Sequence, residues 1–175
     1  METVIQRMPQ LDQVSMDCLV EAYRPFYSPH VLFADVTAIP LPTSFADGVL
    51  ILHVLEHVPD IEKALRELRR VLFKQGGLSG WMLVEVPCFD LNGEHKDCRG
   101  EMTPEERLAC AGQNDHVWRY DCGEFERQLA RNDLWCYQLD GSSPEDFGRA
   151  KGVVNSMNFL GNMPLFACWD SSTKG

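Results

Sequence analysis

The chain has 175 residues, 45% hydrophobic and 24% charged, which suits one domain with one sizeable core. No apolar run approaches the roughly 18 residues of a membrane span. The net charge of -10, with acidic residues spread along the chain, offers no basic stripe for a nucleic-acid backbone. We therefore expect a single domain over residues 1–175 that binds neither membranes nor nucleic acid.

The first segments with a clear pattern predict short buried strands. Residues 14–17 are compatible with a short strand that ends in an aspartate. The apolar, β-branched segment 31–36 is typical of a buried strand. A loop rich in proline follows over 39–48, and a second buried strand is predicted over 49–55.

The clearest helix covers residues 60–77. Its apolar residues recur at positions i, i+3, i+4 and i+7, with charged residues on the opposite face. Asp60 is a good N-cap, and Gly76-Gly77 is a stop signal. A third buried strand is predicted over 81–87. Strand, helix and strand at these lengths indicate a right-handed crossover and hence a parallel sheet.

The second half of the chain starts with a long polar stretch, 88–121. Within it, residues 103–112 favour a short helix capped by Thr103. A further helix and two strands are predicted over 122–133, 134–139 and 164–169. An antiparallel hairpin that closes a parallel sheet would account for these last two strands.

The cysteines and the N-terminus bear on the cellular compartment. The N-terminal segment METVIQRMPQLDQ lacks the apolar core of a secretory signal. The chain contains seven cysteines, an odd number in a chain much larger than a disulfide-stapled miniprotein. We interpret them as reduced thiols and expect a cytoplasmic location.

The segment LHVLEHVPD contains His53-x-x-Glu56-His57, the H-x-x-E-H spacing of inverted zinc peptidases. Two histidines four residues apart on a helix can bind zinc, and the glutamate can act as a base. However, His53 follows a run with strand character, and Pro59 disfavours a helix through the motif. A distant acidic residue would also be needed as the third ligand, and the helix over 122–133 offers Glu124 or Glu126. A strand end followed by a loop fits the segment better.

A longer stretch of sequence resembles a known enzyme family. Its matching letters are Ala34-Asp35-Val36, Leu41-Pro42, Ser44-Phe45, Leu55-Glu56-His57-Val58-Pro59-Asp60, Arg70-Val71-Leu72 and Gly76-Gly77. In this order and context they resemble class I S-adenosylmethionine-dependent methyltransferases, of the methyltransferase type 11 family. Residues 112–121 resemble a loop after the fifth strand of some members. The resemblance extends over about 14–169 and is strongest over 34–87.

The resemblance implies a Rossmann-like α/β fold, mostly parallel, with a C-terminal antiparallel hairpin. It divides the domain into a cofactor-side core (14–87), a variable active-site region (88–121) and a C-terminal helix with strands (122–169). The implied cofactor is S-adenosylmethionine. The implied function is methyl transfer to a small-molecule acceptor.

Site residues carry over from the family position by position. Asp17 matches the acidic residue that binds the ribose hydroxyls, and Asp35 matches the aspartate that meets the adenine amino group. Val36 lines the adenine ring, whereas Leu52 and His53 sit where the fourth strand meets the sulfonium and the substrate. The resemblance thus makes LHVLEHVPD part of the cofactor and substrate site, so we predict no metal ligand.

The candidate catalytic bases are His53, His57 and His116, because histidine titrates near neutrality. Methyl transfer otherwise needs mainly orientation and desolvation, with a base for some acceptors. We therefore expect one of these histidines to accept the proton of the methyl acceptor.

The chain departs from the family pattern at its N-terminus. The family's first strand ends in a glycine-rich loop, but the first glycine of this chain is Gly48. We expect the sheet to be N-terminally truncated, with the first strand and helix missing and cofactor binding impaired. Removal of a central strand either leaves open edges or makes 14–17 and 49–55 pair, and an open edge favours a homodimer.

Two alternatives remain open. The first is a non-catalytic binding or regulatory protein, or a fragment, that keeps the methyltransferase fold without binding cofactor. The second is a zinc-binding protein whose ligands come from Cys88, His95, Cys98, Cys110, His116 and Cys122.

Overall fold

The computed structural model of the protein describes residues 15–17, 31–72, 74–75, 78–89, 91–139 and 165–171. Within these ranges the largest sheet has four strands, in the order β10-β11-β6-β3. Their bounds are Leu134–Leu139 (β10), Leu165–Asp170 (β11), Trp81–Glu85 (β6) and Gly48–Leu52 (β3). β3 and β6 are parallel, whereas β11 is antiparallel to both of its neighbours. The predicted α/β fold with an antiparallel C-terminal pair is confirmed.

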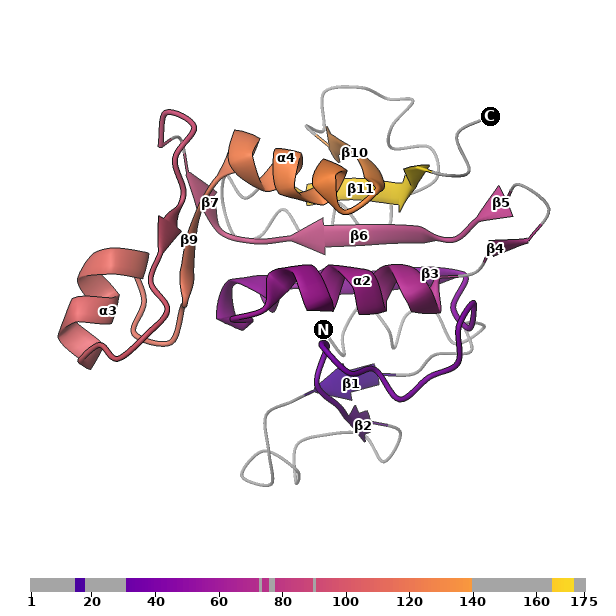
Figure 1. Ribbon diagram of the computed structural model, residues 1–175, viewed down its shortest axis with the longest axis horizontal. Coiled ribbons are helices and arrows are strands. Elements are labelled where there is room, and N and C mark those ends of the chain that lie inside the picture. Colours follow the sequence, from indigo (N-terminus) through magenta and orange to yellow (C-terminus); the bar gives the residue numbers. More distant parts are fainter. Residues whose placement is uncertain are drawn as a thin grey trace.

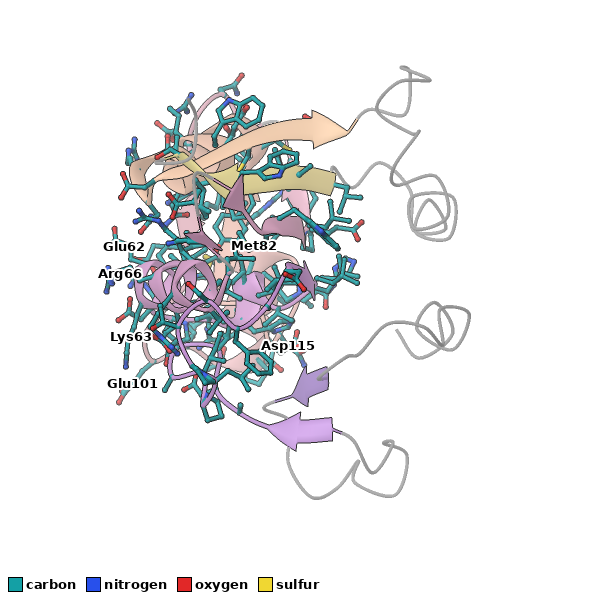
Figure 2. The ribbon with its side chains drawn as sticks, turned by 90° about the vertical axis from the view of Figure 1, so that its right-hand side faces the viewer. Glu62, Lys63, Arg66, Met82, Glu101 and Asp115 are labelled. Carbon is teal, nitrogen blue, oxygen red and sulfur yellow. A yellow bond between two sulfur atoms is a disulfide. The ribbon has the colours of Figure 1, made fainter. Side chains whose placement is uncertain are left out.

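Two amphipathic helices, α2 (Ile61–Val71) and α4 (Cys122–Arg131), lie against this sheet (Figure 1). Each starts after an aspartate, Asp60 or Asp121, whose side chain accepts an N–H of the first turn. The helices share one core with alternate residues of β6 and β11, and this core includes Leu65, Leu68, Met82, Val84, Phe125, Leu129 and Phe166. Figure 2 shows Glu62, Lys63 and Arg66 on the opposite, solvent side of α2.

Helix α2 ends at Val71, although the sequence pattern predicts that Lys74 lies in its last turn and that it stops at Gly76-Gly77. Leu72 explains the difference, because it is fully buried, has extended backbone and forms a β-bridge with Ala46. The Ala46 N–H also donates to the Val71 carbonyl at 2.8 Å, which caps the helix end. A short antiparallel pair follows, formed by Lys74–Gln75 (β4) and Leu78–Ser79 (β5).

Strands β1 (Ser15–Asp17) and β2 (Val31–Phe33) form a parallel pair of their own, separate from the main sheet (Figure 1). β2 is shorter than predicted because the chain turns at Asp35, whose side-chain oxygen accepts the Thr37 N–H at 2.7 Å. Among the described residues, β6 is the only strand that pairs with β3. The segments 14–17 and 49–55 therefore do not re-pair, and the described part of the sheet leaves one edge of β3 open.

The region 88–121 contains more structure than its polar sequence predicts. Helix α3 (Pro104–Ala111) has the expected capping box between Thr103 and Glu106. A small sheet in the order β7-β9-β8 was not predicted, because strands this short show no clear alternation. Its strands are Cys88–Phe89 (β7), Lys96–Asp97 (β8) and Trp118–Asp121 (β9). The end of segment 112–121 is therefore a strand rather than a loop.

Disulfides join four of the cysteines, in the pairs Cys98–Cys110 and Cys136–Cys168. The interpretation of all the cysteines as reduced thiols is wrong for these four. Cys136 and Cys168 face each other in the register of β10 and β11, a pairing that sequence spacing does not reveal. No helix within the described ranges is long and apolar enough to cross a membrane. The cytoplasmic location stays a prediction.

Candidate active site

The chain turns sharply away from the sheet at His53, directly after β3. The φ angle of His53 is +53°, in the left-handed region that residues other than glycine rarely adopt. Its N–H still donates to the Glu85 carbonyl at 3.0 Å, and Leu52 pairs with Glu85 in the strand register. Because β3 and β6 are parallel, both carboxyl ends meet at one edge, where α/β sheets commonly bind ligands.

The turn that follows, Leu55–His57 (η2), is held by the strand β9 and the residue before it. Two backbone carbonyls of the turn and the carbonyl of the residue after it accept hydrogen bonds from residues 117–120. The pairs are Val117 N–H to Glu56 O at 2.8 Å, Tyr120 O–H to Leu55 O at 3.2 Å and Trp118 Nε1–H to Val58 O at 2.8 Å. Since buried carbonyls need partners, these bonds fix the variable region against the end of β3.

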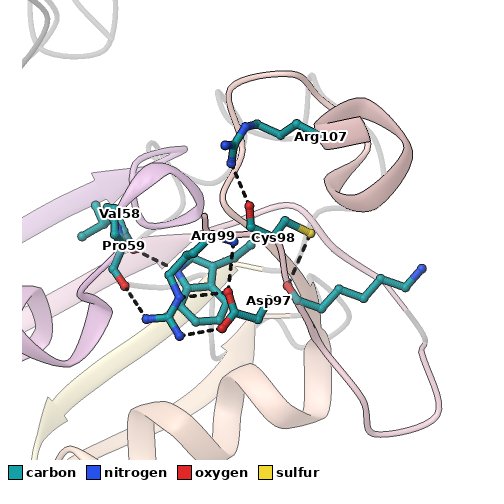
Figure 3. A network of polar contacts seen from close by, with 8 residues as sticks. Val58, Pro59, Asp97, Cys98, Arg99 and Arg107 are labelled. Carbon is teal, nitrogen blue, oxygen red and sulfur yellow. Dashed lines mark hydrogen bonds and ion pairs between the residues drawn. The ribbon is translucent and has the colours of Figure 1, made fainter. Parts of the chain in front are cut away.

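A second polar network strengthens the same contact (Figure 3). Arg99 binds both carboxylate oxygens of Asp97, at 2.9 and 2.6 Å, and donates to the Pro59 carbonyl at 3.1 Å. Its guanidinium also lies 4.3 Å from the centroid of the Trp118 ring. The hydrogen bonds with Arg99 lower the pKa of Asp97 to about 2. Asp97 therefore remains charged and keeps Arg99 in place over a wide pH range.

Six titratable side chains meet at this edge, and we call them the histidine–carboxylate cluster: His53, Glu56, His57, Glu85, Asp115 and His116. His53 lies between two carboxylates, with Nδ1 3.5 Å from Glu56 Oε1 and Nε2 3.9 Å from Glu85 Oε2. The His57 ring packs edge-on against His116, with 4.7 Å between the ring centroids. The structure thus brings together the three histidines that the sequence suggested as bases.

The surroundings of the cluster shift pKa values in both directions. The contact with Glu56 is the main reason that the pKa of His53 is raised above 6.5, and it outweighs the opposing effect of burial. Burial raises the pKa of Glu85 and lowers the pKa of His116. His53 therefore holds a proton more readily than His116 does.

We expect an NMR titration of chelator-treated protein to give a pKa above 6.5 for His53. The variant Glu56→Gln should bring this pKa down, whereas the exposed-surface variant Glu62→Gln should leave it unchanged. By linkage, the stability that His53 contributes is fully present below about pH 6.5 and is lost as the pH rises through the raised pKa. A value at or below 6.5 in the unsubstituted protein would contradict this electrostatic arrangement.

The residues that the resemblance assigns to the cofactor lie at strand ends, but the cluster includes only one of them, His53. Asp17 is the last residue of β1, and Leu52 is the last residue of β3. Asp35 and Val36 follow β2; Asp35 is exposed, and Val36 packs against the hydrophobic core. The backbone thus places each of them after or at the end of its strand.

Sequence reasoning missed the carboxylates of the cluster as site residues. Glu56 was considered only as the base of a zinc peptidase, and Glu85 and Asp115 were not considered. The one signal for Glu85 is a charged residue in the otherwise apolar run WMLVEVP. Cys98 and Cys110 are bonded to each other, so these two thiols drop out of the cysteine-based zinc hypothesis. The rest of that ligand set stays a prediction.

The fold matches the architecture that the sequence resemblance implies. A parallel β3–β6 pair, an antiparallel C-terminal pair and a polar cluster at the carboxyl edge match the class I methyltransferase architecture that the sequence resembles. Residues 11–79 match the methyltransferase domain family of type 11. This match confirms the resemblance to the family over that part of the chain.

Solved structures support the fold. The YcgJ protein of Bacillus subtilis is 15% identical, with a TM-score of 0.59 over 97% of this chain and 87% of that one. A structure of the Haloferax volcanii methyltransferase activator Trm112 with the putative methyltransferase contains a chain that is 13% identical. Its TM-score is 0.58 over 95% of this chain and 76% of that one. A putative S-adenosylmethionine-dependent methyltransferase from Listeria monocytogenes is 15% identical, with a TM-score of 0.50 over 90% of this chain and 78% of that one. Among curated proteins, none matches the chain.

Proposed function

We propose that this protein is an S-adenosylmethionine-dependent methyltransferase that acts on a small-molecule acceptor. The observation that carries the proposal is the position of His53. It lies at the carboxyl end of β3, held between the carboxylates of Glu56 and Glu85. A histidine oriented by carboxylates at a ligand-binding edge is the usual arrangement of a general base.

The cofactor-side residues fit this function in part. Asp35 is exposed, and among the described residues its carboxylate accepts one hydrogen bond, from the Thr37 N–H at 2.7 Å, so it retains lone pairs for an adenine amino group. Val36 and Leu52 offer half-buried apolar surface at the same strand ends.

The chain's own residues would then position the acceptor and move its proton. The bound cofactor supplies a methyl group that its sulfonium already activates for displacement. The His53 side chain is 32% exposed, and its Nε2 has no hydrogen-bond partner among the described residues. A rotation of the ring would bring this nitrogen to the acceptor, whose proton it would take. Glu56, on the other side of the ring, would stabilise the imidazolium that forms.

The test is a calorimetric titration of the full chain with S-adenosylhomocysteine. We expect micromolar binding that falls at least tenfold in Asp35→Ala. Asp47→Ala, which removes another exposed aspartate in the loop before β3, should bind as the unsubstituted protein does. Binding that is unchanged in Asp35→Ala would contradict the assignment of the adenine position.

A second candidate is a non-catalytic protein that keeps the fold as a binding module. Within the described residues one edge of β3 has no paired strand, and such an edge favours this candidate because it is a ready template for another strand, including that of a second copy. The absence of any S-adenosylhomocysteine binding at millimolar concentration, with the protein folded, would favour this candidate over the enzyme.

A further inference from the structure

Glu56 is a buried carboxylate without a hydrogen-bond partner. Its side chain is 1% exposed, and neither Oε1 nor Oε2 accepts a hydrogen bond. The nearest nitrogens of neighbouring side chains are His53 Nδ1 at 3.5 Å and His57 Nε2 at 3.9 Å, both longer than a hydrogen bond. Burial of a carboxylate without hydrogen bonds is costly, and the described residues offer this one only histidine nitrogens at 3.5 Å or more. A bound cation would stabilise it.

His57 presents a lone pair towards this carboxylate. Its Nδ1 lies 3.1 Å from the backbone carbonyl of Asp115, and a carbonyl can only accept, so this hydrogen bond requires the tautomer with the proton on Nδ1. In the neutral ring of this tautomer the lone pair is on Nε2, the atom that lies 3.9 Å from Glu56 Oε1. Histidines that bind metals typically donate their other N–H to a carbonyl or carboxylate in this way.

His116 completes the group from a distant part of the chain. It is 5% exposed and lies next to His57, and the bond from the Val117 N–H to the Glu56 carbonyl holds its backbone against η2. One ligand atom from each of Glu56, His57 and His116 lies within 4.8 Å of the other two. Ligands about 2.1 Å from a tetrahedral ion are roughly 3.4 Å apart, so small side-chain rotations suffice.

We propose that Glu56, His57 and His116 bind one divalent transition-metal ion, with zinc as the probe, and leave a coordination position open. Two imidazole nitrogens and one carboxylate oxygen suit zinc, whereas magnesium and calcium prefer oxygen ligands alone. The inference is independent of methyl transfer, because a protein that binds no cofactor could still hold the ion. It also replaces the sequence-based expectation that this segment has no metal ligand.

This arrangement differs from the zinc-peptidase reading of H-x-x-E-H. In that motif both histidines bind the metal on one helix, and the glutamate acts as the base. Here η2 is a single 3-10 turn, and His53 belongs to the end of β3, where its Nε2 faces Glu85. Glu56 becomes a ligand, and His116, from the variable region, takes the place of His53.

The experiment is a zinc titration of the full chain after treatment with a chelator, followed by competition with a chromophoric zinc indicator. We expect one ion per chain, with affinity reduced at least tenfold in Glu56→Gln and in His116→Gln. The matched variants Glu62→Gln and His95→Gln change residues outside the group and should keep the original affinity. Circular dichroism of each metal-free variant shows whether it remains folded.

Thiols outside the disulfides provide the competing explanation. Cys88 and Cys122 are not in a disulfide, so zinc bound by sulfur would give the same stoichiometry. Cobalt(II) separates the two cases, because thiolate ligands add intense charge-transfer absorption that nitrogen and oxygen ligands lack. Visible bands without sulfur charge transfer, lost in Glu56→Gln, support the proposal. No binding, or binding that survives both Glu56→Gln and His116→Gln, overturns it.

Discussion

Replacement of Asp170 with alanine should lower the free energy of unfolding by about 3 kcal/mol, because it breaks a buried ion pair. The Asp170 side chain is fully buried, and its Oδ2 lies 2.6 Å from Arg69 Nε and 2.6 Å from Lys74 Nζ. These contacts join the C-terminal end of β11 to helix α2 and to β4. Urea unfolding followed by circular dichroism measures the change.

Asp133 provides a matched control, because it binds the same arginine. Its Oδ2 lies 2.7 Å from Arg69 Nη1, but its side chain is 63% exposed. An exposed ion pair contributes little, so Asp133→Asn should cost less than about 1 kcal/mol. Asparagine is chosen because it tolerates the left-handed backbone of this residue, whose φ angle is +57°. Equal losses in the two variants would show that burial does not set the strength of this network.

The variant Glu56→Gln should stabilise the metal-free protein by about 1–3 kcal/mol at pH 8, because it removes a buried charge that has no hydrogen-bond partner. The gain should shrink at pH 5.5, where His53 is protonated and partly compensates Glu56. Denaturant unfolding at both pH values, in the presence of a chelator, gives the comparison.

Two observations would contradict this prediction. A loss of stability at pH 8 would mean that Glu56 is already compensated in the metal-free protein. An equal gain at both pH values would mean that His53 does not interact with it. The expected gain identifies Glu56 as a residue retained for binding at a cost in stability.

The helices and longer strands could be predicted because each carries a regular hydrophobic pattern. The stripe of α2 and the run of β10 are examples, and both lie where the sequence places them. The predicted end of α2 was wrong, because the bridge between Leu72 and Ala46 is a tertiary contact that the local sequence does not reveal. The strands β7 and β8 were missed because two residues show no alternation.

For the candidate site, the sequence could predict which types of residue take part, but not how they are arranged. The H-x-x-E-H spacing drew attention to His53, Glu56 and His57, but local sequence does not show which atoms face one another. That depends on the chain turn at His53 and on His116, which lies 60 residues beyond Glu56. Burial of Glu56 follows from this long-range packing, so its unpaired carboxylate could not be foreseen.

The most direct test of the account is a crystal structure of the protein with S-adenosylhomocysteine. The account predicts the adenine ring beside Asp35 and Val36 and the sulfur near Leu52 and His53, at the carboxyl ends of β2 and β3. Ligand density anywhere else on the molecule would contradict the proposed function, and so would its absence at millimolar concentration.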